Sequence, residues 1–124
     1  MIQSAFMEDF MIILKNEFDA GEGSFLIKLR PNLEWDKAAF NRLASAMKSC
    51  TEKESSEKKL ERWVAEGFWF IPRFVRDWAT HSNFPRVHPR DYYERAFTRL
   101  EDLAYWYFMG QSPYESGKHF EDLD

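Results

Sequence analysis

The sequence predicts an all-α protein, a single bundle of about five helices over residues 1–114 followed by an acidic tail over residues 115–124. Two observations carry this prediction. Apolar side chains recur three or four residues apart through most of the chain, and glycine or proline stands between the periodic segments. A length of 124 residues, of which 44% are hydrophobic, suffices for one core without disulfide bonds.

The first helix is expected between residues 2 and 18, where the apolar residues follow a helical period. Ser4 is a suitable N-cap, because its hydroxyl can accept a hydrogen bond from a first-turn amide. Gly21 is a natural stop. An alternative pairs residues 11–15 with residues 25–29 as a β-hairpin, but the helical period is the better match to the sequence.

Residues 24–30 alternate between two sets of side chains, which indicates a short extended segment. A short helical turn capped by Ser24 is the alternative. In either case we expect the segment to end at Pro31, since the residue before a proline avoids the helical region.

The next helix has the clearest beginning. Asp36 can cap it, and Trp35 and Phe40 occupy the two positions of a hydrophobic staple. Its apolar stripe consists of Phe40, Leu43, Ala44, Met47 and Cys50. Residues 49–59 are almost wholly Ser, Thr, Glu and Lys, which predicts a solvated loop or a frayed helix end.

Two further helices are expected between residues 60 and 79. The first is short and stops at Gly67. The second begins near Trp69, so that Pro72 falls in the first helical turn, where proline is tolerated.

The last helix is expected from Pro89 to Gly110 after a loop over residues 81–88. One face carries the predicted core residues Tyr93, Ala96, Phe97, Leu100, Leu103, Ala104, Tyr107 and Phe108. The opposite face carries Tyr92, Arg95, Arg99, Asp102 and Trp106.

Residues 62–114 contain fifteen aromatic residues and seven arginines but no lysine. A chain of this length cannot easily bury so much ring area in one core. The outer face of the last helix combines Tyr92, Arg95, Arg99 and Trp106, a composition typical of binding hot spots. The alternative is intramolecular: Arg95 and Arg99 pair with neighbouring acids, and Trp106 packs on the tail.

Trp69 and Arg73 are the remaining candidates for a binding site. Trp69 lies in the run Phe68–Pro72, whose five bulky residues cannot all face one side of a helix. Any exposed part of this run would line an apolar pocket or a dimer interface. Arg73, one turn further on, could supply a polar group to such a site.

No catalytic set and no cofactor motif is recognisable. Asp77, His81 and His88 could in principle ligate a transition metal, but their spacing matches no established metal motif, so no metal site is predicted. Cys50 is the only cysteine and is expected to be an inert core residue, which suits a reducing compartment.

Most of the formal net charge of −4 resides in the tail, and the body of the chain is nearly neutral. No basic field exists to gather nucleic acid or anionic lipid, so neither is expected as a partner. The longest apolar run, Leu103–Met109, is seven residues, far short of the ~20 that cross a membrane. The N-terminus also lacks the basic segment of a signal peptide. We therefore expect a cytoplasmic protein.

These features favour a non-enzymatic protein-interaction module of the accessory, adaptor or toxin-neutralising type. Its partner would be another protein or a second copy of the chain, as in a homodimer. The alternative is a small-molecule-binding protein or enzyme with an aromatic pocket between the C-terminal helices. An enclosed pocket with convergent charges would favour the alternative, and a filled core with an exposed aromatic patch would favour the module.

Overall fold

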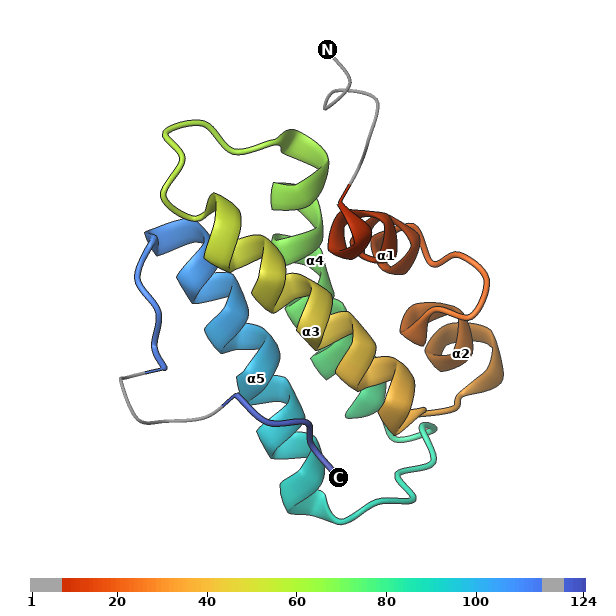
Figure 1. Ribbon diagram of the computed structural model, residues 1–124. Helices are drawn as coiled ribbons and strands as arrows, with labels where there is room; N and C mark the ends of the chain where they lie inside the picture. The colour runs from red at the N-terminus through yellow and green to blue at the C-terminus, as the bar shows by residue number, and fades with distance from the viewer. Residues whose placement is uncertain (1–7, 115–119) are drawn as a thin grey trace.

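The computed structural model is all-helical, as the sequence predicts, and three long helices form its centre (Figure 1). It describes residues 8–114 and 120–124. The helices are α1 (Asp9–Phe18), α2 (Phe25–Asn32), α3 (Lys37–Glu54), α4 (Arg62–Ala79) and α5 (Arg90–Met109). Helix α3 packs against α1, α2 and α5, and α4 packs against α5. In Figure 1, α3 and α5 run side by side with α4 behind them, and α1 and α2 cover one flank.

The first two helices differ in part from the prediction. The expected N-cap Ser4 lies outside the described residues, and α1 begins at Asp9. Residues 25–32 form a helix, so the extended segment is wrong and the alternative capped by Ser24 is correct: its hydroxyl accepts from the Ile27 amide at 3.2 Å. Pro31 lies inside the last turn of α2 and does not end it. The helix is favoured because it turns Phe25, Leu26 and Leu29 into the core together.

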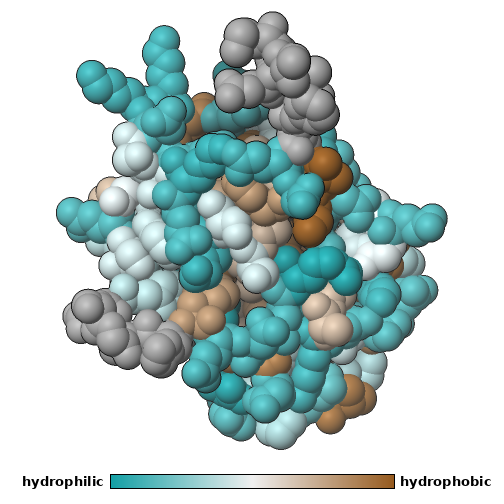
Figure 2. Space-filling view, viewed as in Figure 1, coloured by the Kyte–Doolittle hydropathy of each residue, from teal (hydrophilic) through white to brown (hydrophobic). Residues whose placement is uncertain are grey.

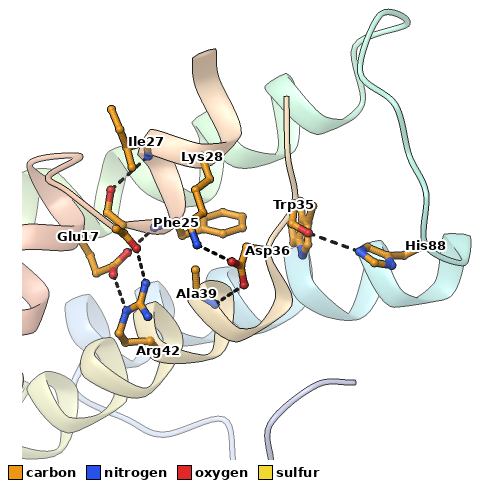
Figure 3. Close-up of polar contacts among 11 residues, drawn as sticks. Glu17, Phe25, Ile27, Lys28, Trp35, Asp36, Ala39, Arg42 and His88 are labelled. Carbon is orange, nitrogen blue, oxygen red and sulfur yellow. Dashed lines mark hydrogen bonds and ion pairs between the residues drawn. The ribbon is translucent and has the colours of Figure 1, made fainter. Parts of the chain in front are cut away.

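A buried carboxylate joins α1, α2 and α3 (Figure 3). Glu17 on α1 accepts a hydrogen bond from the Phe25 amide at 2.8 Å, which satisfies a first-turn donor of α2. Its other oxygen accepts from Arg42 Nε on α3 at 2.9 Å. A buried charge is tolerated only when it is paired and hydrogen-bonded, and Glu17 meets both conditions.

The beginning of α3 agrees with the prediction. The Asp36 carboxylate accepts from the Ala39 amide at 2.9 Å and from Lys28 Nζ at 2.5 Å. The rings of Trp35 and Phe40 stack at 5.4 Å, which closes the expected staple. The helix continues to Glu54, so only the second half of the polar segment over residues 49–59 lies outside it.

Helix α4 is continuous through Gly67, where the sequence predicted a stop. The reason is packing against α1: a Cβ atom at Gly67 would lie 2.1 Å from the ring of Phe18. Glycine is therefore present for close approach rather than for a turn. Pro72 consequently lies in the interior of α4 and not in a first turn. At the other end of the bundle, Gly110 caps α5 with φ 74°, as predicted.

We predict that Gly67→Ala destabilises the protein by about 1 to 3 kcal/mol, the usual cost of overpacking a filled core. The sign is diagnostic, because alanine in place of a helix-interior glycine otherwise stabilises by roughly 1 kcal/mol. Urea titration measures the change. In the Phe18→Ala background the same substitution should become neutral or stabilising. A loss of equal size in both backgrounds would contradict the contact.

The Asp36 carboxylate should make stability depend on pH. Its hydrogen bond from Lys28, followed by that from the Ala39 amide, holds the pKa of Asp36 below its ordinary value. Its contribution is therefore present above the ordinary pKa and is lost as pH falls through the lowered one. Asp36→Asn should cost up to about 1 kcal/mol at neutral pH, since it keeps an acceptor but loses the charge.

Urea titrations of the two proteins between about pH 7 and about pH 3 check this expectation. The difference between them should shrink toward the acid end, as protonation of the wild-type carboxyl begins to remove its charge. Lys28→Gln removes the partner and should reproduce part of the effect. A difference that stays constant over the whole range would contradict the assignment.

Candidate functional site

The predicted outer face of α5 does not form one surface. Tyr92 was expected on it, but this residue is only 1% exposed, so its placement there is wrong. Its hydroxyl accepts a hydrogen bond from Trp35 Nε1 at 2.9 Å. The ring of His88 lies 5.4 Å from it. Trp35 before α3 and the loop before α5 therefore cover Tyr92 at the beginning of α5. The helical period of α5 alone could not predict these contacts.

Arg99 and Trp106 both face segments that follow α5. The intramolecular alternative expected Arg99 to pair with a neighbouring acid, but Arg99 binds the C-terminal segment instead. Arg99 Nη1 donates to the Glu121 carbonyl at 2.8 Å, and its guanidinium lies 3.9 Å from the Phe120 ring centre. The rings of Trp106 and Tyr114 lie 6.4 Å apart. Residues 120–124 therefore pack on the bundle between α3 and α5 (Figure 1).

The same segment is fixed from α3. The Asn41 side chain donates to the Leu123 carbonyl at 2.9 Å and accepts from its amide at 3.1 Å. Figure 2 shows this side of the molecule as mostly hydrophilic, with apolar side chains in small patches. Arg95 remains exposed and lies 3.7 Å from Asp91, a local pair that the sequence also suggested. This side of the protein offers little apolar surface to a partner.

The exposed aromatic surface lies instead between α4 and α5. Trp69 and Arg73 on α4, both predicted binding residues, face Tyr105, Phe108 and Met109 on α5 across an open groove of about 590 Å³. We call it the α4–α5 groove. Trp69 is 57% exposed and Met109 62%, and Tyr105 and Phe108 are also exposed. The predicted placement of Phe108 in the core is wrong, whereas its neighbour Tyr107 is buried there as predicted.

Four charged side chains line the α4–α5 groove: Arg73, Arg76 and Asp77 on α4 and Glu101 on α5. The Arg73 guanidinium lies over the Trp69 ring, 4.7 Å from its centre, in a cation–π contact. Arg76 on α4 pairs with Glu101 on α5 at 2.9 Å. The groove is thus lined by apolar side chains, one stacked arginine, the carboxylate of Asp77 and one neutralised ion pair.

The spacing of residues in the sequence does identify the side of α5 that lines the groove, but the two predicted faces of α5 do not group these residues together. Glu101, Tyr105, Phe108 and Met109 are spaced four, three and one residues apart and so share one side of a helix. The prediction places the second apolar side of α5 at Tyr92, Arg99 and Trp106 instead. Helix α5 thus carries apolar side chains on three sides, and only its packing against the rest of the chain shows which side stays exposed.

Three tryptophans of the last two helices, Trp69, Trp78 and Trp106, do not meet around one pocket. Trp69 is in the α4–α5 groove, and Trp106 lies beside Tyr114. Trp78 donates from Nε1 to the Leu29 carbonyl at 3.0 Å and thereby joins α4 to α2.

Of the three residues weighed as metal ligands, His81 and His88 contact other groups, and Asp77 is exposed on α4. His81 Nδ1 accepts from the Asn83 amide at 3.1 Å, and His88 Nε2 lies 3.5 Å from the Trp35 carbonyl oxygen. Within residues 8–114 and 120–124, no three His, Cys, Asp or Glu side chains come together in a way that could hold a metal ion.

Cys50 is buried on α3 and is a poor nucleophile. Burial, followed by the nearby charges of Glu54 and Glu61, raises the pKa of its thiol to about 12. Burial also raises the pKa of the Tyr107 hydroxyl above its ordinary value. Both groups are neutral at physiological pH, and the thiolate is the reactive form of cysteine.

Comparison of the chain with protein-family models, with curated proteins and with solved structures finds no match. Among the helices described, none has both the length and the apolar character needed to traverse a bilayer. The geometry of the α4–α5 groove is therefore the basis for inferring function.

We predict that Cys50 reacts with a disulfide reagent such as DTNB only when the fold opens. A pKa of about 12 leaves roughly a thousandfold less thiolate at pH 8 than an ordinary cysteine has. Absorbance at the thionitrobenzoate band measures the rate in native buffer and in guanidinium chloride. The native rate should be slower by at least that factor, and equal rates would contradict the buried placement.

Proposed function

We propose that this chain is a non-enzymatic protein-interaction module whose binding surface is the α4–α5 groove. The observation that carries the proposal is the exposure of Trp69, Tyr105, Phe108 and Met109 side by side on two packed helices. Contiguous apolar patches on soluble proteins mark interaction sites. Aromatic residues, methionine and arginine are the residue types enriched at such interfaces.

The shape of the groove favours a helix of a protein as its occupant. It runs between two helices and is open to solvent, and an amphipathic helix can lay its apolar face into such a groove. A small-molecule site has less support, because such sites enclose most of the ligand and direct a few polar groups at it. Here Arg76 and Glu101 neutralise each other.

The chain should occur in a complex that depends on the groove. We expect Trp69→Ala combined with Phe108→Ala to abolish this complex, because each truncated hot-spot residue weakens binding by about 2 kcal/mol or more. Stability should change by no more than about 0.5 kcal/mol per substitution, since both side chains are exposed. Gel filtration of extracts of cells that naturally express the chain, with immunodetection, measures the size of the complex.

Val87→Ala is the matched control, because Val87 is apolar and 75% exposed but lies on the loop before α5. Wild type and Val87→Ala should elute above the 14.9 kDa of a single chain, and the groove variant should elute as a monomer. Elution of the wild type as a monomer would overturn the proposed function.

A further inference from the structure

The outward side of α4 carries a line of exposed residues that begins with a charged pair, passes through two aromatic residues and ends with another charged pair. We call this line the α4 stripe. It consists of Arg62, Glu66, Trp69, Phe70, Arg73 and Asp77. At 3.6 residues per turn these six positions fall within an arc of about 100°. They form one face, opposite the side of α4 that is buried.

The α4 stripe borders the α4–α5 groove and shares Trp69, Arg73 and Asp77 with it. The other apolar member, Phe70, is exposed and stacks on Phe74 at 5.2 Å. The stripe therefore extends the apolar surface of the groove across the outside of α4. A partner seated on this part of the protein would contact both.

The charges of the α4 stripe are arranged symmetrically about its centre, between Trp69 and Phe70. Glu66 lies three residues before Trp69, and Arg73 lies three residues after Phe70. Arg62 lies seven residues before Trp69, and Asp77 lies seven residues after Phe70. In each of these two pairs, the residues equidistant from the centre carry opposite charges.

This pattern is complementary to itself. Suppose that a second α4 packs antiparallel on the first, about a two-fold axis that passes beside the centre. Each residue then faces the residue of the other helix that lies equally far from the centre on its opposite side. Glu66 of one copy then faces Arg73 of the other, and Arg62 faces Asp77. Each of these contacts occurs twice, as in any isologous interface. Trp69 and Phe70 lie at the middle, each next to its own counterpart, where a dimer interface is most apolar.

The four charges are also free to pair with another molecule. Arg62 and Glu66 are four residues apart, as are Arg73 and Asp77, and these spacings permit ion pairs along the helix. Neither pair forms, and none of these four side chains has an ion pair with any other described residue. By contrast, Arg76 and Glu101, just outside the stripe, pair within the chain.

We infer that the partner of this module is a second copy of the same chain, bound as a two-fold symmetric dimer with the two α4 helices antiparallel across the α4 stripe. The inference rests on the proposed interaction function and names the partner. The two-fold axis keeps Trp69 of both copies on the side of the α4–α5 groove, so the α4 helix of the other copy covers the α4 side of the groove and directs its Trp69 ring into it.

Charge reversal tests the arrangement with the purified full-length chain. Arg73→Glu alone places two glutamates opposite each other at both Glu66–Arg73 contacts, and Glu66→Arg alone places two arginines there. Each single variant should dimerise more weakly than wild type, on the order of 100-fold, because facing like charges disfavour association. Sedimentation velocity over a concentration series measures the dissociation constants.

An equimolar mixture of the two single variants should form heterodimers, because every facing pair then has opposite charges. The double variant Glu66→Arg with Arg73→Glu should regain the homodimer. Native mass spectrometry distinguishes the heterodimer by its mass. The double variant also shows that weak association of the single variants does not result from misfolding, since it contains both substitutions.

Arg95→Glu and Glu94→Arg are the matched controls, because both residues are exposed on α5 outside the stripe. They should leave the dimer unchanged. Single variants that dimerise like wild type, or a mixture that stays monomeric, would overturn the antiparallel α4 interface. If purified wild type is monomeric while the complex persists in extracts, the proposed function stands and the partner is a different protein. If wild type is monomeric both when purified and in extracts, the symmetric dimer and the proposed interaction function are both wrong.

Discussion

The packing of Trp35 fixes the part of the bundle on which the remaining helices depend. This residue lies just before α3 and is 5% exposed, and its ring contacts Phe25 of α2 at 4.8 Å and Tyr93 of α5 at 5.1 Å. Its indole nitrogen donates to the Tyr92 hydroxyl, so its polar group is satisfied inside the core. Because one side chain orients both α2 and the beginning of α5, the side of α5 that faces the core is set there. The sides that remain available for α4, for the C-terminal segment and for solvent follow from it.

Helix α4 reaches its position through close contacts on its inner side. Phe68 stacks on Tyr107 of α5 at 4.2 Å with nearly parallel rings, and Gly67 lets Phe18 of α1 approach the backbone. These contacts account for the buried half of α4, so its other half faces solvent. The many aromatic side chains of the sequence therefore fall into a buried group and an exposed group. One part fills the core around Trp35 and Phe68, and the other part is displayed around Trp69.

The surface around Trp69 combines the two properties that association requires. Its apolar area supplies affinity, and its charges restrict the geometry of association. The alternating charges of Arg62, Glu66, Arg73 and Asp77 leave the α4 stripe neutral overall, so it neither repels a second copy nor attracts polyanions. On the opposite side of the bundle, Arg99 is engaged by the C-terminal segment, and the acidic end of the chain is kept away from α4.

The sequence by itself determined the helical class, the capping of α3 by Asp36, the end of α5 at Gly110 and the presence of more aromatic residues than one small core requires. Each of these depends on interactions between residues close in the chain. The local sequence pattern was insufficient wherever it was compatible with more than one structure. Gly67 could end a helix or allow a close contact, and residues 25–32 could form a strand or a helix. The pattern was equally insufficient for α5, where Tyr92, Trp106 and Phe108 lie on different sides and all can be buried. Which side is covered depends on Trp35, on residues 120–124 and on α4, segments distant in sequence that only the tertiary structure brings together.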